Sequence, residues 1–177
     1  MRIHAEIPLI DDTLNGWSES IGRDLNGYRN HVYRMVNFTY AMGEFDEAAR
    51  QTIAIAGCFH DIGIWPERTL DYLEPSANRA EEYLAEKGLS GVQPRIREMI
   101  CQHHKLRRFK SDPLVEAFRK GDLVDLSLGK FKCGLPNSYV REVKAAFPNA
   151  GFHKCLVGVA SRWILRHPLS PVPVLRF

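Results

Sequence analysis

A histidine and an aspartate stand side by side at the end of an apolar run, in the segment Gly57-Cys58-Phe59-His60-Asp61-Ile62-Gly63. Imidazole and carboxylate are both common metal ligands, and packing alone does not explain two of them between an apolar wall and a glycine. Consecutive helical residues diverge by about 100°, so both side chains can bind one ion only where the last turn faces a cavity. We expect Gly63 to end the helix there. The segment predicts the centre of a metal site that takes further ligands from elsewhere in the chain.

Further candidate ligands lie on the apolar faces of two other predicted helices. A helix over residues 24–42 places His31 within an apolar stripe, where a buried histidine needs a partner. A helix over residues 112–128 carries Asp122 on its apolar face, with Asp125 one turn beyond. The candidates therefore follow the order His…His-Asp…Asp along the chain.

This order, with Phe-His-Asp-Ile-Gly at its centre and Gly-Asp-Leu-Val-Asp downstream, resembles the HD-domain superfamily of metal-dependent phosphohydrolases over about residues 30–126. The resemblance implies an all-helical fold in which His31, His60, Asp61 and Asp122 bind one divalent metal ion. Such nitrogen and hard oxygen ligands suit manganese, iron, cobalt, nickel, zinc or magnesium. A metal ion polarises a phosphoryl oxygen and lowers the pKa of bound water. The implied activity is hydrolysis of a phosphoester in a small phosphorylated molecule or nucleotide.

Each candidate ligand also has a simpler interpretation. His31 by itself could be a core histidine, and His60-Asp61 could be only a helix end, where the helix dipole favours histidine. Asp122 and Asp125 compete for the last ligand position. In the family the ligand aspartate follows a small residue, here Gly121, which favours Asp122. Asp125 would then be a partner of a ligand or an exposed carboxylate.

The remaining catalytic groups are harder to assign from the sequence. Asp61 is expected to act in catalysis as well as in metal binding. In some family members a carboxylate shortly after the doublet assists the water, and Glu67 or Glu74 would be that group here, with Glu74 as our candidate. The basic segment 105–110 could draw an anionic substrate to the pocket, with Lys105 as the catalytic candidate. Such a run is more often a solvated loop.

His103 and His104 end another predicted helix, and could be an additional metal ligand or a substrate contact, as extra histidines are in some HD-domain proteins. They could equally be two histidines at a helix C-terminus. Family members with two metal ions usually have a further histidine after the doublet, and residues 62–102 contain none. One ion is therefore expected, unless a glutamate substitutes as a ligand. The glutamates in question are Glu74, Glu81 and Glu82.

Three other functions remain open on the same residues. A two-iron oxygenase occurs on this fold, but it needs two metal ions. A hydratase or lyase would use the same activated water. A regulatory module would keep the metal pocket without turnover, which the retention of all four ligand types argues against.

Apolar periodicity predicts a single all-α domain of six to eight helices over residues 1–177, with no alternating strand. The expected helices cover residues 11–21, 24–42, 46–61, 77–87, 94–104, 112–128, 137–146 and 152–166. Trp65-Pro66 is expected in a loop and residues 70–73 in a helical turn. Residues 168–177 are expected to form an extended tail, because three prolines interrupt any helix there.

Composition narrows the class of protein. A chain of 177 residues with 45% apolar and 25% charged residues is typical of one globular domain. The net charge of +3 is too small to predict nucleic-acid binding. The four cysteines form no Cys-x-x-Cys pair, so reduced thiols in a cytoplasmic protein are expected. No window approaches the ~20 apolar residues of a membrane span. We expect a small anionic substrate as partner and no membrane, and leave the oligomeric state open.

Overall fold

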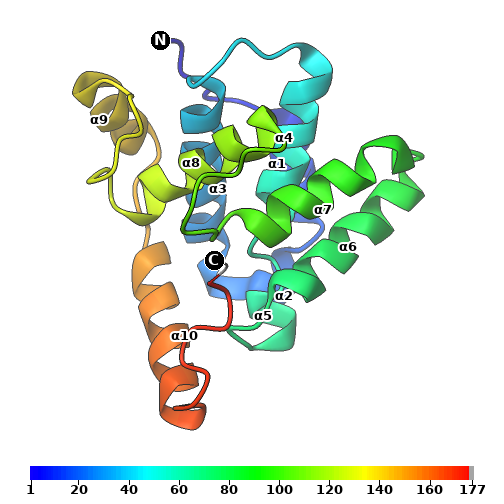
Figure 1. Ribbon diagram of the computed structural model, residues 1–177, viewed down its shortest axis with the longest axis vertical. Coiled ribbons are helices and arrows are strands. Elements are labelled where there is room, and N and C mark those ends of the chain that lie inside the picture. Colours follow the sequence, from blue (N-terminus) through cyan, green and yellow to red (C-terminus); the bar gives the residue numbers. More distant parts are fainter. Residues whose placement is uncertain (176–177) are drawn as a thin grey trace.

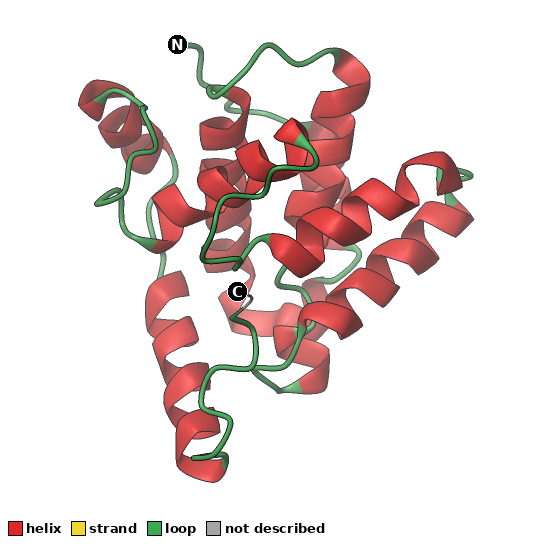
Figure 2. Ribbon diagram, in the orientation of Figure 1, coloured by secondary structure: helices red, strands yellow, loops and turns green. Residues whose placement is uncertain are grey.

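The computed structural model describes residues 1–175, and all regular secondary structure in that range is helical (Figure 2). The eight longer α-helices are α1 (Pro8–Asn15), α3 (Leu25–Tyr40), α4 (Glu47–Phe59), α6 (Leu73–Glu86), α7 (Gln93–Gln102), α8 (Pro113–Leu126), α9 (Asn137–Ala146) and α10 (Phe152–Arg166). Shorter pieces are α2 (Ser18–Ile21), α5 (Ile64–Glu67) and the 3-10 turns η1 (Gly22–Asp24) and η2 (Ser90–Val92). The all-α prediction is confirmed. Within these residues no helix combines the length and the apolar character that a bilayer span needs.

Helix α3 forms the centre of the domain, with α1, α4, α8, α9 and α10 packed around it (Figure 1). Eleven of its sixteen residues are buried, so it is enclosed on most of its circumference rather than along one stripe. Its polar residues His31, Arg34 and Asn37 are among the buried ones. Because a buried polar group is costly without a partner, the neighbouring helices must supply hydrogen-bonding groups to α3.

Helix α8 approaches α3 closely at a glycine. A Cβ atom at Gly121 would lie 2.0 Å from Thr39 Oγ1 and 2.7 Å from the Met35 carbonyl oxygen, both on α3. Only a residue without a side chain fits this contact. The following residue, Asp122, is therefore held against α3 and close to His31.

Helix α4 begins at an N-cap and ends before the histidine. The Asp46 side chain accepts a hydrogen bond of 2.8 Å from the Ala49 backbone N–H, which satisfies one free donor of the first turn. After Phe59 the chain makes a turn over residues 60–63 and enters α5.

Gly63 does not end a helix, and this expectation was wrong. Its φ of −62° is right-handed, and it stands just before α5. A Cβ atom there would lie 2.8 Å from the Tyr72 carbonyl oxygen and 3.0 Å from Ser76 Oγ. Gly63 is required because the turn passes close to the start of α6, which fixes the position of the preceding Asp61.

Most helix ends lie within two residues of the predicted ones, and three elements differ by more. The first helix begins at Pro8, and a turn at Gly16 and Trp17 separates α1 from α2. Trp65 and Pro66 belong to α5 rather than to a loop. Helix α6 starts at Leu73, so residues 70–72 are not helical and proline 75 lies within the first turn. Proline is tolerated there because the first backbone N–H groups of a helix have no intrahelical acceptor.

The C-terminal segment is not extended over its described part, residues 168–175. Leu175 N–H donates to the Val172 carbonyl oxygen at 3.3 Å, so the chain turns back. Val174 is 6% exposed and packs in a small apolar cluster with Ile64, Leu70, Tyr72 and Leu73. The end of the described chain accordingly lies against the body of the domain (Figure 1). Apolar packing overrides the local preference of the prolines, and positions 176 and 177 lie outside the described residues.

Candidate metal centre

The predicted ligands meet in the interior, where α3, α4, α7 and α8 converge. His31 Nε2 lies 2.9 Å from His60 Nε2. Asp122 Oδ1 is 3.6 Å from His31 Nε2 and 3.7 Å from His60 Nε2, and Asp61 Oδ2 is 3.4 Å from His60 Nε2. His103, at the end of α7, adds its Nε2 at 3.5 Å from Asp61 Oδ1. None of these five residues is more than 4% exposed. The structure thus brings together the four predicted ligands and His103, and it places His104 within reach of His103 and Asp122.

The other ring nitrogen of each histidine faces a group that can only accept a hydrogen bond. His31 Nδ1 is 2.7 Å from Asp125 Oδ2. His60 Nδ1 is 2.8 Å from the Gly57 carbonyl oxygen, and His103 Nδ1 is 2.7 Å from that of Ile100. Each Nδ1 must therefore carry the hydrogen. In a neutral ring Nε2 then carries a lone pair, so all three Nε2 atoms are acceptors.

The interior of the cluster consequently holds acceptors without donors. The Nε2 lone pairs of His31 and His60 face each other, and two carboxylates stand beside them. Asp61 Oδ1 and His103 Nε2 are buried without a hydrogen-bond partner among residues 1–175. Convergent lone pairs in a buried space need a cation. Three overlapping groups could hold a metal ion: His31, His60 and Asp122; His60, Asp61 and His103; and His103, His104 and Asp122.

The charge states of these residues suit a metal site. Burial lowers the pKa of His60 to about 3, against the opposing charge of Asp61, so this ring is neutral and free to bind a metal. Burial raises the pKa of Asp122 to about 6. Burial alone would raise the pKa of Asp61 too, but the adjacent His60 and His103 lower it. For His103, burial is outweighed by the two carboxylates, which raise its pKa. Without a metal ion, a proton on Asp122 or His103 offsets the excess of acceptors.

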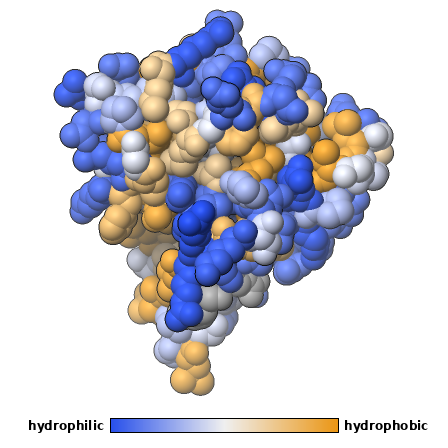
Figure 3. Space-filling model, turned by 45° about the horizontal axis from the view of Figure 1, so that its top comes forward, coloured by the Kyte–Doolittle hydropathy of each residue, from blue (hydrophilic) through white to orange (hydrophobic). Residues whose placement is uncertain are grey.

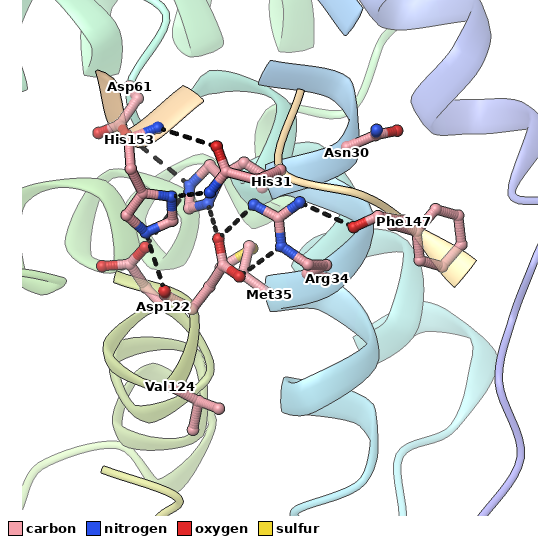
Figure 4. Close-up of polar contacts among 12 residues, drawn as sticks. Asn30, His31, Arg34, Met35, Asp61, Asp122, Val124, Phe147 and His153 are labelled. Atoms are coloured by element: carbon pink, nitrogen blue, oxygen red, sulfur yellow. Dashed lines mark hydrogen bonds and ion pairs between the residues drawn. The ribbon is translucent and has the colours of Figure 1, made fainter. Parts of the chain in front are cut away.

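Asp125 contacts His31 at Nδ1, on the side of the ring that faces away from the cluster. Besides accepting from His31 Nδ1, it accepts from Arg34 Nε at 2.5 Å and from Arg34 Nη2 at 2.8 Å. Arg34 Nη1 donates to the carbonyl oxygens of Phe147 and Pro148 at 3.0 and 3.2 Å. Figure 4 shows the contact between the Arg34 guanidinium and the Phe147 carbonyl oxygen. Burial opposes ionisation of Asp125, but His31 and Arg34 hold its pKa well below the usual range. Asp125 is therefore an anion that fixes the orientation and the tautomer of His31.

Two contacts of the site were not predicted from the sequence. The Arg34 side chain is one turn from His31 on a helix that is otherwise apolar there, and a charged residue in such a position is a signal for a buried partner. Phe152 stacks on the His31 ring with centroids 4.0 Å apart and planes at 12°. It lies far along the chain, and no sequence pattern indicates this contact.

His104 and Lys105 line a cavity of about 140 Å³ that reaches the cluster at His103 and Asp122. His104 Nε2 is 2.8 Å from the Tyr72 hydroxyl. The remaining lining residues are Leu106, Arg119, Leu123, Leu126 and Leu175. His104 thus lines the cavity and contacts Tyr72, a residue that the sequence did not indicate, and the C-terminal segment contributes Leu175.

The predicted carboxylates downstream of the doublet are not in contact with the cluster. Glu74 pairs with Arg97 at the surface, and its side chain is 55% exposed. Glu67 pairs with Arg79 at 2.5 Å, and Glu81 also pairs with Arg97, at 2.9 Å. Glu82 is exposed as well. A role for Glu74 in catalysis stays a prediction that these contacts do not support.

Only the first part of the basic segment 105–110 faces the cluster. Arg108 and Lys110 line a separate groove, together with Lys120. Lys105 is the one cation of the segment that lines the 140 Å³ cavity. Attraction of an anion to the site would therefore depend on Lys105 more than on its basic neighbours.

No protein-family model, no curated protein and no solved structure matches this chain. The fold and the site thus define a helical protein with a buried cluster of histidines and aspartates that could hold a metal ion.

Proposed function

We propose that this chain is a metal-dependent phosphohydrolase with a site like that of the HD domain. His31, His60, Asp61 and Asp122 would hold one divalent metal ion, and His103 is a further candidate ligand. The observation that carries the proposal is the convergence of three Nε2 lone pairs and two carboxylates in a space without donors. A divalent cation could bind three of these ligands at once, in the group of His31, His60 and Asp122 or in that of His60, Asp61 and His103, whereas one proton is shared by two.

The ion would supply Lewis-acid chemistry, because a bound metal polarises a phosphoryl oxygen and lowers the pKa of a coordinated water. The chain itself keeps the site dry and oriented. Asp125 and the Gly57 carbonyl hold the rings of His31 and His60 with Nε2 directed inward. In the hydrolysis, an oxygen of water bonds to phosphorus, the bond to the leaving oxygen breaks, and a proton passes to the leaving group.

The cavity beside the cluster favours a small substrate. Its volume of about 140 Å³ is below the roughly 300 Å³ at which pockets for drug-sized ligands begin. Lys105 lines this cavity together with Asp122 and His103, and a lysine ammonium suits a phosphoryl group. The leucines of the wall suit a short apolar remainder. A small phosphomonoester therefore fits better than a whole nucleotide.

A second candidate function is supported by the third ligand group. His103, His104 and Asp122 could hold an ion, and Asp122 also belongs to the group of His31 and His60. Two ions sharing Asp122 would permit the chemistry of a two-iron oxygenase. The number of ions per chain separates the two candidates.

The test combines metal analysis with a panel of phosphoesters. The purified chain should contain about one divalent ion and release phosphate from a small phosphomonoester. Asp61→Asn keeps the shape of the side chain and should lose both properties. His167→Ala, which changes an exposed histidine stacked on Trp163, should retain both. Glu74→Gln should also retain both, because Glu74 faces solvent. Full occupancy by one ion without phosphate release from any substrate would refute the hydrolase, and two irons per chain would favour the oxygenase.

A further inference from the structure

A second cavity, away from the metal cluster, is lined by cationic side chains. It has a volume of about 520 Å³ and lies between residues 20–24, α5 and α10. Arginines from all three segments line it: Arg23, Arg68, Arg162 and Arg166. His167 adds an imidazole, and Asp24 is the one acid among the lining residues. No residue of the metal cluster takes part. We call this cavity the arginine groove.

The charges of the arginine groove are not balanced within residues 1–175. Arg68, Arg162 and Arg166 form no ion pair with any of these residues. Asp24 is 4.0 Å from Arg23. The Asp24 Oδ2 atom is already an acceptor for Trp65 Nε1, at 3.2 Å, and for Cys155 Sγ, at 3.4 Å. Four exposed arginines therefore line the groove beside one carboxylate that has other partners, which gives this concave surface a positive potential.

The backbone of one arginine is held in a costly conformation. Arg68 has φ 51° and ψ 36°, the left-handed region that favours glycine. A residue with a Cβ atom is disfavoured there. Such positions cluster at functional sites, where the side chain is needed. Arg68 is the C-cap residue of α5, and Arg23 and Arg166 lie in the last turns of η1 and α10, where a cation is favourable in any case. Arg162, inside α10, has no such explanation.

We propose that the arginine groove binds a small oligoanion with two or more phosphoryl groups. Guanidinium groups bind phosphate oxygens through paired charge-assisted hydrogen bonds, and three separate segments supply them here. A volume of about 520 Å³ lies within the range of small-molecule sites. A single phosphate would engage only part of this set. The proposal goes beyond the hydrolase and does not depend on it.

A lipid surface is the main competing partner for these arginines. The end of α10 carries exposed apolar side chains, with Ile164 43%, Leu165 83% and Leu169 101% exposed. Figure 3 shows hydrophobic surface gathered at this lower tip of the molecule. The arginines, however, line the walls of a groove rather than a flat plane beside that tip. Their arrangement therefore favours a small ligand over a membrane.

Two tryptophans of the arginine groove allow binding to be followed by fluorescence. Trp65 and Trp163 both line it. Trp65 also packs on Tyr28, with ring centroids 4.6 Å apart, and Tyr28 lies 6.2 Å from both His31 and His60. Binding in the groove should therefore change tryptophan fluorescence.

The test is a titration with inorganic tripolyphosphate, followed by tryptophan fluorescence and calorimetry. The full chain is used after removal of metal by dialysis against a chelator, and again as Asp61→Asn, so that the metal centre cannot account for binding. Saturable binding of one ion per chain is expected in both, with orthophosphate binding at least tenfold more weakly. Absence of saturable binding at millimolar tripolyphosphate would overturn the proposal.

Two variants locate the site. The double variant Arg162→Gln/Arg166→Gln should weaken binding at least tenfold. The control Lys130→Gln/Arg141→Gln removes the same charge from exposed positions outside the groove and should weaken it less than twofold. Equal losses in the two double variants would overturn the proposal, because they would show a non-specific charge effect.

Arg68→Gly separates binding from folding. It removes a guanidinium and relieves the left-handed strain, so its melting temperature should equal or exceed that of the wild type while tripolyphosphate binds more weakly. Unchanged affinity in this variant would exclude Arg68 from the site. Binding to vesicles of anionic lipid with none to tripolyphosphate would overturn the proposal in favour of a membrane surface.

Discussion

Neutralising Asp125 should weaken both the fold and the metal site, because this carboxylate links Arg34 to His31. In Asp125→Asn the new amide group can accept through one atom only. An NH₂ group at the Oδ1 position faces Arg34 Nε–H, and one at the Oδ2 position faces both Arg34 Nη2–H and His31 Nδ1–H. Breaking a buried ion pair costs about 3–5 kcal/mol. Arg34 keeps its two backbone acceptors, so we expect the lower end of that range.

The effect on the metal site is expected in addition to the loss of stability. Removing the partner that orients a ligating histidine typically costs about 10–100-fold in metal affinity. Thermal denaturation of the metal-free protein measures the loss of stability, because each kcal/mol lowers the melting temperature of a chain of this size by roughly 2–4 °C. Calorimetric titration with Mn²⁺ or Zn²⁺ measures the loss of metal affinity.

Two further variants make the expectation specific. Asp11→Asn changes another Arg–Asp pair of α3, because Arg29 Nη2 is 2.6 Å from Asp11 Oδ1. That pair is partly exposed, so the variant should cost about 1 kcal/mol or less and leave metal affinity unchanged. Arg34→Met should destabilise the fold but retain the acceptor of His31, so metal affinity should fall much less than in Asp125→Asn. Wild-type metal affinity in Asp125→Asn would refute the role assigned to this carboxylate.

Two other predictions concern the packing and the protonation of the site. Gly121→Ala should lower stability by about 1–3 kcal/mol through overpacking against Thr39 and Met35. The control Gly158→Ala should instead gain up to about 1 kcal/mol of stability from helix propensity, because a Cβ atom there meets nothing within 4 Å. A melting temperature of Gly121→Ala at or above that of the wild type would contradict this reasoning. Metal affinity should fall about tenfold for each pH unit below about 6, because the ion must then displace a proton from Asp122. Affinities measured by titration that stay constant between about pH 5 and 7 would argue against Asp122 as a ligand.

The sequence indicates most of the metal site because its residues are conspicuous in local patterns. A histidine within an apolar stripe and a His-Asp pair at the end of an apolar run are visible without coordinates. The choice between Asp122 and Asp125 was weaker, and it rested on Gly121. The structure supplies the physical reason, since the glycine lets α8 press against α3 at that point.

The misjudged elements are those whose conformation depends on distant contacts. Gly63 was interpreted as a helix stop, whereas it is required by the close passage of Tyr72 and Ser76. The proline-rich segment was expected to be extended, whereas Val174 packs into an apolar cluster and turns the chain back. Local propensities are worth at most a few kcal/mol, so a buried contact from elsewhere in the chain can overrule them.

By itself the sequence determined an all-helical protein and the side chains that could hold a metal ion, because periodicity and residue type are local properties. Only the tertiary structure decided which nitrogen of each histidine faces inward, since that depends on the acceptor behind the ring. It also decided that Asp125 supports His31, that Glu74 points to solvent, and that arginines from three segments face one groove. These facts depend on how helices far apart in the chain pack together, and no local pattern in the sequence encodes that arrangement.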